Sequence, residues 1–273
     1  MKYDIIIPSF YRADKDYTEL CVQSLRDSGF DGSIIVVTNG TSALEPLNVK
    51  ALRLHIKTQG QANATNIGVQ LATNDYIMVS NSDMYYVPGW DKNLRFDYPV
   101  FSPNLIEPIN NAGSAPPFLK LDGGLTLEEF NRPRVDGFVQ DTLQAMEKMK
   151  EPTEETGFNL PFFIKRDFWN FLGGYDTNFD PWGSNSDTCL QTRINLAGIT
   201  PMRLRDVLVY HFGNKSGTFD GTHQDYYQHN IDYFRQKFGF DRDELGSDVW
   251  MNKDMLPTDP TQIKYKQKKY AGL

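Results

Sequence analysis

The segment from residue 60 to residue 90 constrains the fold most. Residues 76–79, Tyr-Ile-Met-Val, form a continuous apolar run of strand length, and we expect a strand over Tyr76–Ser80. The preceding stretch Ala62–Leu71 predicts a helix that turns Ala64, Ile67, Gly68 and Leu71 inward. The polar residues Asn81, Ser82 and Asp83 follow the strand directly. Ligands of open α/β sheets bind at the carboxyl ends of strands, so the sequence predicts a ligand site there.

The residues before this segment repeat the same alternation of strand and helix. Apolar runs predict strands over Asp4–Pro8, Ser33–Val37 and Leu52–Ile56. Between the first two, Asp16–Ser28 has an apolar helical face, and Gly29 is placed to end that helix. Strand, helix and strand in this order predict a right-handed parallel unit. We therefore expect a βαβ pattern over the first hundred residues.

The pattern loosens from residue 101 to residue 157, where prolines interrupt it before a helix predicted over Val135–Lys150. We interpret this irregular stretch as a cover for a site. Farther along, the sequence predicts a strand over Phe162–Ile164, a helix opened by Asp187, a strand over Val207–Tyr210 that ends at His211, and a late helix with the apolar positions Tyr227, Ile231, Phe234 and Phe238. Beyond residue 241 the polar sequence predicts a wrapping or loosely ordered tail.

Composition excludes several classes of protein. The net charge of -7, with no broad basic face, argues against nucleic acid as a partner, and a phosphorylated ligand must then meet local positive charge or a metal. No apolar run approaches the roughly 20 residues that span a bilayer, and we expect a soluble, cytoplasmic protein without a transmembrane segment. Cys21 and Cys189 stand at apolar helical positions and are predicted to be buried thiols. The basic segment 264–270 is interpreted as a solvated terminus, with a membrane or acceptor anchor as the alternative.

Six separated segments carry a family resemblance. In chain order they are IIIPSFYR (5–12), VVTNGTS (36–42), NATNIGVQLATNDYIMVSNSD (63–83), LPFFIKRDFWNFLGGYDTNF (160–179), WGSNSDTCLQTRINLAG (182–198) and HFGNKS (211–216). In this order and spacing they resemble the GT-A glycosyltransferases, especially the family 2 type, over residues 3 to 240. The resemblance implies an α/β fold with a Rossmann-like, mixed and mainly parallel sheet, flanked by helices and followed by a C-terminal helical appendage. Residues 1–100 would form the nucleotide-sugar-binding half, residues 101–240 the acceptor-binding and catalytic half of the same domain, and residues 241–273 a tail.

The resemblance also implies a divalent cation, Mn²⁺ or Mg²⁺, because the departing nucleotide diphosphate carries negative charge. The family's Asp-x-Asp motif corresponds to Asn81-Ser82-Asp83, so the first acid is missing. Asp83 is then the expected metal ligand, and His211 resembles the late histidine that completes the coordination. Asn81 is left to offer its carbonyl or to bind ribose. The plainer alternatives are a polar turn after the strand and a structural histidine.

The resemblance places the donor pocket at the ends of the first strands. Thr38 stands where the family commonly has an aspartate that binds the base, and Asn66 is expected to hold a loop, contact the nucleotide or cap a helix. Arg12 is interpreted as a phosphate contact, with an ordinary surface arginine as the alternative. The expected donor-binding residues are Pro8, Ser9, Tyr11, Arg12, Thr38, Asn39, Asn63, Asn66, Asn81, Ser82 and Lys215.

Asp187 is the expected catalytic base, which removes the proton of the attacking acceptor hydroxyl. It resembles the aspartate of the family's Glu-Asp motif, although Ser186 replaces the glutamate. The alternative role of Asp187 is a helix N-cap. Asp180 and Trp182 are expected to bind the acceptor, where an indole ring can stack on a sugar, with core packing as the alternative for Trp182.

These residues together predict a metal-dependent, hexosyltransferase-like glycosyltransferase. It would move a sugar from a nucleotide-diphosphate sugar to a hydroxyl of a saccharide, glycolipid or protein acceptor, with inversion by direct displacement. A retaining enzyme and a catalytically inactive carbohydrate-binding protein are the alternatives. A nucleotidyltransferase is disfavoured, because no Gly-rich phosphate loop with a basic residue follows the first strand. The sequence specifies neither the sugar, the base and the acceptor nor the oligomeric state.

Overall fold

A computed structural model describes residues 2–40, 51–56, 60–109, 118–213, 215, 224–241, 256–257 and 259–271. Its strands are β1 (Tyr3–Ser9), β2 (Ile34–Asn39), β3 (Leu52–Ile56), β4 (Tyr76–Val79), β5 (Met84–Tyr85), β6 (Val100–Pro108), β7 (Leu119–Leu121), β8 (Glu154–Thr156), β9 (Phe162–Lys165) and β10 (Met202–His211). Its α-helices are α1 (Tyr11–Asp27), α2 (Gln61–Gln70), α3 (Arg132–Met149), α4 (Arg166–Leu172), α5 (Ser186–Leu196) and α6 (Gln224–Phe238). Short 3₁₀ turns cover Thr177–Phe179 (η1) and Pro260–Gln262 (η3).

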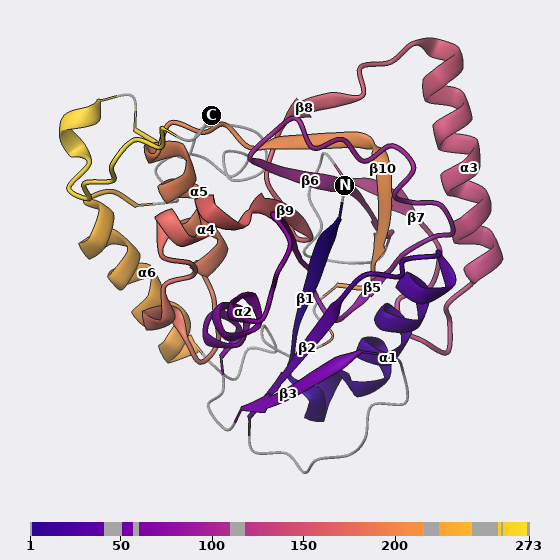
Figure 1. Cartoon of the computed structure of the whole chain (residues 1–273), viewed down its shortest axis with the longest axis horizontal. Coiled ribbons are helices and arrows are strands. Elements are labelled where there is room, and N and C mark those ends of the chain that lie inside the picture. Colours follow the sequence, from indigo (N-terminus) through magenta and orange to yellow (C-terminus); the bar gives the residue numbers. More distant parts are fainter. Residues whose placement is uncertain are drawn as a thin grey trace.

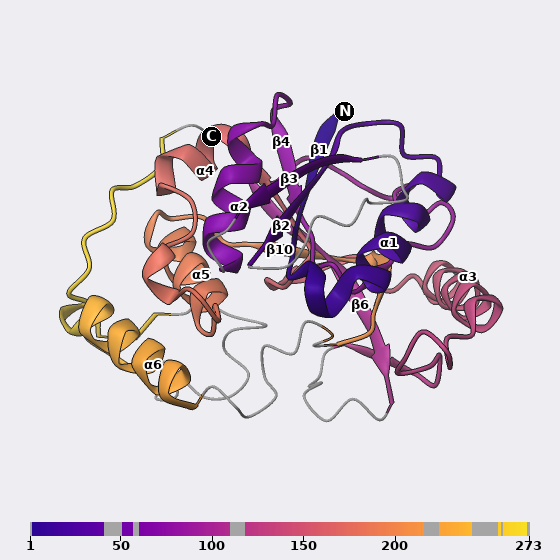
Figure 2. The same cartoon turned by 90° about the horizontal axis from the view of Figure 1, so that it is seen from below.

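The described strands form one ten-stranded mixed sheet in the order β3-β2-β1-β4-β9-β6-β10-β5, with β7 beside β6 and β8 beside β10. Strands β1 to β4 run parallel to one another where they pair. Strand β9 enters antiparallel between β4 and β6, and it thereby joins the first hundred residues to the later strands. Figures 1 and 2 show this sheet between α2, α4 and α5 on one side and α1 and α3 on the other. The mixed sheet flanked by helices is the predicted fold class.

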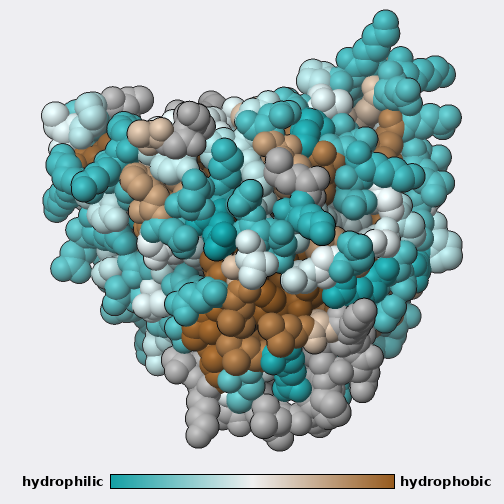
Figure 3. Space-filling model, viewed as in Figure 1, coloured by the Kyte–Doolittle hydropathy of each residue, from teal (hydrophilic) through white to brown (hydrophobic). Residues whose placement is uncertain are grey.

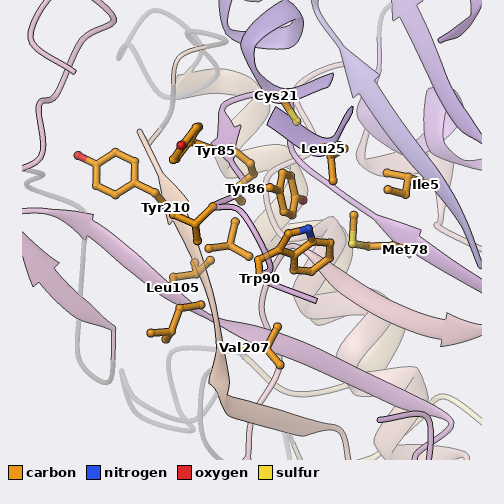
Figure 4. Close-up of a cluster of buried hydrophobic side chains, with 14 of the residues drawn as sticks. Ile5, Cys21, Leu25, Met78, Tyr85, Tyr86, Trp90, Leu105, Val207 and Tyr210 are labelled. Carbon is orange, nitrogen blue, oxygen red and sulfur yellow. The ribbon is translucent and has the colours of Figure 1, made fainter. Parts of the chain in front are cut away.

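Alternate residues of the central strand supply two separate hydrophobic clusters. Ile5 and Ile7 of β1 pack toward α1, whereas Ile6 packs toward α2. Both sets are fully buried because side chains alternate across a strand and helices cover both faces of the sheet. Figure 4 shows the first cluster, in which Tyr86 lies against Trp90 with ring centroids 4.7 Å apart. The βαβ half of the chain thus follows from its apolar runs.

The prediction of an irregular stretch from residue 101 was wrong for its first part. Residues 100–108 form β6, a fully buried strand in the interior of the sheet, in spite of Pro103 and Pro108. The register of β10 against β6 shifts between Leu204 and Leu208, next to Pro103, and β9 pairs β6 only at Val100 and Phe101. The strand accommodates Pro103 because neither neighbour continues a regular hydrogen-bond ladder past it.

The boundaries and faces of several helices and strands differ from the prediction. The first helix begins at Tyr11 instead of Asp16, with a non-helical residue, Asp14, inside it. In α2 the buried residues include Ala64 and Gly68 as predicted, but Leu71 is 45% exposed. Leu52 of the edge strand β3 is 57% exposed, and Figure 3 shows a hydrophobic area in the region where Figure 1 draws α2 and β3. The last strand is longer than predicted, because β10 begins at Met202 and includes His211.

The C-terminal segments pack on the α5 side of the molecule. Phe234 and Phe238 of α6 form a small third cluster with Phe179 and Cys189. The described tail residues 259–271 return to the domain, where the Tyr270 N–H donates to the Ala197 carbonyl at 3.0 Å. Cys21 and Cys189 are free and buried, as predicted. Among the described helices, no segment has the length and apolar character that crossing a bilayer requires.

Candidate functional site

The carboxyl ends of β1 and β2 are joined to the start of α2 by one amide side chain. The Nδ2 of Asn39 donates to the Ser9 carbonyl at 3.0 Å, and the N–H of Gly60 donates to the Asn39 Oδ1 at 3.1 Å. Pro8, the residue before Ser9, is buried in β1 opposite Val37. The structure therefore brings three elements of the predicted donor pocket to one edge of the sheet, with Asn39 at their junction.

Ser9 and Ser82, two predicted donor-binding residues, meet through a carboxylate that the sequence analysis missed. Asp14 is fully buried at the irregularity in α1, its Oδ1 accepts from Ser9 Oγ at 2.8 Å, and its Oδ2 accepts from Ser82 Oγ. Burial raises the pKa of Asp14 to about 6, although the two hydroxyl hydrogen bonds oppose that rise. Asp14 thus ties the loop before α1 to the Asn81-Ser82-Asp83 loop. The sequence contained one signal for Asp14: it is an acidic residue between the end of the first predicted strand and the predicted helix start at Asp16.

Other predicted donor contacts have mainly structural partners in the described residues. The Thr38 hydroxyl lies 3.1 Å from His55 Nδ1 and donates to the Leu54 carbonyl at 3.3 Å, so it links β2 to β3. The Asn81 carbonyl accepts from Ser80 Oγ at 2.8 Å, and the Asn81 side chain is partly exposed. Two more, Tyr11 and Arg12, begin α1, and their side chains lie outside the described part of the structure.

Asp83 and His211 face each other across the ends of β5 and β10. Asp83 Oδ1 lies 3.4 Å from His211 Nε2, and the backbone N–H of Lys215 donates to Asp83 Oδ2 at 3.1 Å. Burial raises the pKa of Asp83, but the facing imidazole and the Lys215 N–H outweigh burial and hold that pKa below its usual range. The other ring nitrogen, Nδ1, lies 2.9 Å from Glu107 Oε1 of β6. The predicted metal ligands Asp83 and His211 are therefore in contact, and the backbone of Lys215, a predicted donor-binding residue, is beside them.

Asp187 lies in the first turn of α5 and does not cap it. The N-cap residue is Asn185, in a left-handed conformation with φ 63°. The Asp187 Oδ1 accepts a 2.5 Å hydrogen bond from the hydroxyl of Tyr175, a fully buried residue that the sequence analysis did not select. Burial raises the pKa of Asp187 to about 6, and the Tyr175 hydrogen bond opposes that rise. A carboxylate with this pKa is ionised at neutral pH and still basic enough to accept a proton.

Asn66 holds the loop that carries Tyr175. The Tyr175 N–H donates to Asn66 Oδ1 at 2.8 Å, and Asn66 Nδ2 donates to the Tyr175 carbonyl at 2.9 Å. Gly174 has φ 70°, and a Cβ there would lie 2.4 Å from Asn66 Oδ1, so the glycine permits this close approach. Of the roles expected for Asn66, the structure contains the loop-holding one.

Asp180 is engaged by the N-terminus of α2. Its two oxygens accept from the backbone N–H groups of Ala62 at 3.1 Å and Asn63 at 2.9 Å, as a capping carboxylate does. Trp182, two residues later, is partly buried, with its ring 6.4 Å from that of Phe10 and 6.3 Å from that of Tyr226. Since Phe10 follows β1 directly, the predicted acceptor residues lie beside the edge of the sheet that holds Ser9 and Asn39. Acceptor binding by Asp180 and Trp182 stays a prediction.

The described residues can hold a divalent cation only with help from a ligand. No group of three or more His, Cys, Asp or Glu side chains in the described ranges could hold a metal ion. Two of the predicted ligands, Asp83 and His211, lie 3.4 Å apart in the described part. The remaining positions of such a cation would be open to diphosphate oxygens, which is how Mg²⁺ commonly binds at phosphate-transfer sites.

Residues 4–95 match the model of the glycosyl transferase family 2. No curated protein matches the chain. Among solved structures, residues 1–349 of TarS from S. aureus have a TM-score of 0.50 at 12% identity, with 79% of this chain and 62% of that chain covered. GalNAc-T7 with UDP, GalNAc and Mn²⁺ has a TM-score of 0.50 at 15% identity, with 77% of this chain and 43% of that chain covered. This chain thus spans less than two thirds of either structure. It has the GT-A glycosyltransferase fold, and its N-terminal third matches glycosyl transferase family 2.

Proposed function

We propose that this protein is a metal-dependent glycosyltransferase that moves a sugar from a nucleotide-diphosphate sugar to an acceptor hydroxyl, with inversion by direct displacement. The observation that carries the proposal is the contact between Asp83 and His211 at the end of the sheet where β1, β2 and β4 also end. A buried carboxylate and an imidazole converge there beside the backbone of Lys215. This is the place where α/β sheets bind ligands.

The geometry of the pair suits Mn²⁺ or Mg²⁺. Two ligands about 2.1 Å from one ion and at right angles lie about 3 Å apart. The observed separation of 3.4 Å between Asp83 Oδ1 and His211 Nε2 is close to that value. A bound cation would supply charge stabilisation to the departing diphosphate. The GalNAc-T7 structure, which contains UDP and Mn²⁺ on a similar fold, is consistent with this chemistry.

Asp187 is proposed as the general base. In direct displacement the acceptor oxygen forms a bond to the anomeric carbon while the bond from that carbon to the phosphate oxygen breaks, and the electron pair leaves with the nucleotide diphosphate. The acceptor proton goes to the Asp187 carboxylate, whose pKa of about 6 suits that task near neutral pH. Tyr175 and Asn66 hold the carboxylate in place.

The donor and the acceptor are proposed to lie on opposite sides of the Asp83–His211 pair and Asp187. On the donor side, Ser9 and Asn39 end β1 and β2, and Ser82 lies between β4 and β5. Asn63 lies in the first turn of α2. The Trp182 ring is proposed as the acceptor contact, because an aromatic ring can pack on the apolar face of a sugar. A saccharide, a glycolipid and a protein that bears such a sugar share this chemistry.

The test is to measure nucleotide diphosphate release from a panel of nucleotide sugars in the presence of Mn²⁺, together with donor binding by calorimetry. We expect the wild type to release nucleotide diphosphate from one of the nucleotide sugars in the panel. Asp83→Ala should lose both Mn²⁺-dependent binding and release, whereas Asp187→Asn should keep binding and lose release. The matched control is Asp141→Ala, an exposed position on α3 far in sequence from the site, which should behave as the wild type.

Two results would contradict the proposal. If the wild type binds no nucleotide sugar in Mn²⁺, the protein is not a transferase of this kind. If a donor binds and Asp187→Asn releases nucleotide as fast as the wild type, then Asp187 is not the base, and the retaining alternative gains support.

A further inference from the structure

Four ionisable side chains lie in a row across neighbouring strands at the candidate metal site. Asp83 immediately precedes β5, and the N–H of Phe212 donates to its carbonyl at 3.1 Å, which sets β5 beside the end of β10. His211 ends β10, Glu107 lies on the next strand, β6, and Lys120 is its register partner on β7. The strand register therefore places a carboxylate, an imidazole, a second carboxylate and an ammonium group side by side.

Glu107 is the carboxylate of this row that has no role so far. Its side chain is 94% buried, given a relative exposure of 6%. Oε1 lies 2.9 Å from His211 Nδ1, whereas Oε2 lies 3.6 Å from Lys120 Nζ. Within the described part of the chain, neither Glu107 Oε2 nor Lys120 Nζ has a hydrogen-bond partner. Burial of a carboxylate is costly unless it is paired. If Glu107 served only to pair β6 with β7, the Lys120 ammonium group would be its nearest partner. Instead, its shorter contact is with the His211 ring.

The position of Glu107 bears on which ring nitrogen carries the proton when His211 is neutral. Two carboxylates face the ring, Glu107 at 2.9 Å from Nδ1 and Asp83 at 3.4 Å from Nε2. A proton on Nδ1 is donated to Glu107, and the lone pair of Nε2 is then free to point toward the side of Asp83. A proton on Nε2 would instead be donated to Asp83, and that nitrogen would be unable to bind a metal. The shorter contact favours the first arrangement.

We propose that Glu107 is a positioning residue that holds His211 with its proton on Nδ1, so that Nε2 and Asp83 together present a preformed pair of ligands to a divalent cation. Lys120 balances the charge of Glu107 from the far side. The inference rests on the proposed metal-dependent function. It adds a second layer to the site, since metal-binding histidines generally donate their other N–H to a carboxylate or carbonyl.

The tautomer is measured by ¹⁵N-edited NMR of the histidine rings in a pH series, at a pH where the ring shifts themselves show His211 to be neutral. The chain has four histidines, and His211→Asn assigns the signals of the relevant one. We expect the Nδ1–H form in the wild type and a large fraction of the Nε2–H form in Glu107→Gln, whose amide can either accept from or donate to Nδ1. Lys120→Met keeps the Glu107 contact and should keep the wild-type tautomer.

The metal affinity is measured separately, by electron paramagnetic resonance of free Mn²⁺ in titrations with Mn²⁺ alone. Glu107→Gln should weaken binding by about 10- to 100-fold, the usual effect of removing such an outer partner. Asp83→Ala should abolish binding. The matched control is Glu155→Gln, which alters a carboxylate paired with the buried Arg203 on the same sheet and should leave Mn²⁺ binding unchanged. Melting temperatures of all variants identify any that fail to fold, and Glu107→Leu provides a second variant without an amide.

The outcomes distinguish a failure of the role proposed for Glu107 from a failure of the proposed metal-dependent function. If Asp83→Ala loses Mn²⁺ while folded Glu107→Gln and Glu107→Leu bind as the wild type does, the role of Glu107 is overturned and the metal site stands. The Nε2–H tautomer in the wild type would also overturn it. If the wild type and Asp83→Ala bind Mn²⁺ alike, the proposed metal site falls, and the role of Glu107 falls with it.

Discussion

Replacing Tyr175 by phenylalanine should make Asp187 a stronger base and move the activity to higher pH. The Tyr175 hydroxyl donates a 2.5 Å hydrogen bond to the Asp187 carboxylate and stabilises its charged form. A hydrogen bond to a charged group contributes about 1.5–3 kcal/mol, and one pKa unit corresponds to about 1.4 kcal/mol, so its loss should raise the Asp187 pKa by about 1 to 2. The present value is about 6, set by burial against this hydrogen bond.

The sign of the pH effect follows from the role of the base. Asp187 accepts a proton only when ionised, so activity should fall as pH drops through its pKa, near 6 in the wild type. In Tyr175→Phe the same fall should begin about 1 to 2 pH units higher. The assay is the pH dependence of kcat/KM for nucleotide release with saturating Mn²⁺.

Tyr98→Phe is the matched control, because Tyr98 donates a hydrogen bond of the same 2.5 Å length to Glu154 on another part of the sheet. Its pH profile should be that of the wild type. An unmoved acidic limb in a folded Tyr175→Phe would refute the reasoning. It would mean that Asp187 is not the group that titrates, or that Tyr175 does not control it.

Two further predictions concern the structure that holds the site. Asp14→Asn should stabilise the protein at pH 8 by up to about 3 kcal/mol. The folded-state pKa of Asp14 is raised from 3.8 to about 6, so the folded state loses stability as pH rises through that window and the buried carboxyl group ionises. Asparagine does not ionise and avoids this loss. Chemical denaturation at pH 4 and pH 8 checks this against the exposed control Asp16→Asn, and equal or lower stability of Asp14→Asn at pH 8 would contradict it. Gly60→Ala should destabilise by about 1–3 kcal/mol, because φ is 151° there and a Cβ would lie 2.2 Å from the Asp180 carboxyl carbon that caps α2. Gly137→Ala, in α3 with nothing within 4 Å of the added Cβ, should instead stabilise by about 0.5–1 kcal/mol, and melting curves that rank the two variants the other way would show the cap to be unimportant.

Local sequence pattern predicted the parallel half of the fold because each strand there is a continuous apolar run that can be recognised without its neighbours. The apolar runs at β1, β2 and β4 are continuous, since helices cover both faces of that part of the sheet. The strand β6 escaped prediction because Pro103 and Pro108 normally argue against an interior strand. The strand accommodates Pro103 because the register of β10 shifts beside it and β9 pairs β6 at Val100 and Phe101, and both are properties of other segments.

Some residues of the candidate site were predicted from the sequence, and others were missed. Asp83 and His211 were selected by their family context, and the structure places them in contact. Glu107 was missed because its partner His211 is 104 residues away, and Asp14 because Ser82 is 68 residues away. Tyr175 is only 12 residues from Asp187, but the loop between them follows no periodic pattern. Such partners are defined by strand register and loop closure, which a local pattern does not contain.

In the proposed function, Asp83 and His211 bind the divalent cation on which glycosyl transfer depends. The most direct measurement is nucleotide diphosphate release from the matching donor after removal of divalent metal by a chelator and stepwise return of Mn²⁺, for the wild type, Asp83→Ala and His211→Ala. We expect the wild type to lose activity when the metal is removed and to regain it when Mn²⁺ is returned, whereas neither variant recovers. Full release by the wild type in chelator, or recovery of both variants at the wild-type Mn²⁺ concentration, would contradict it.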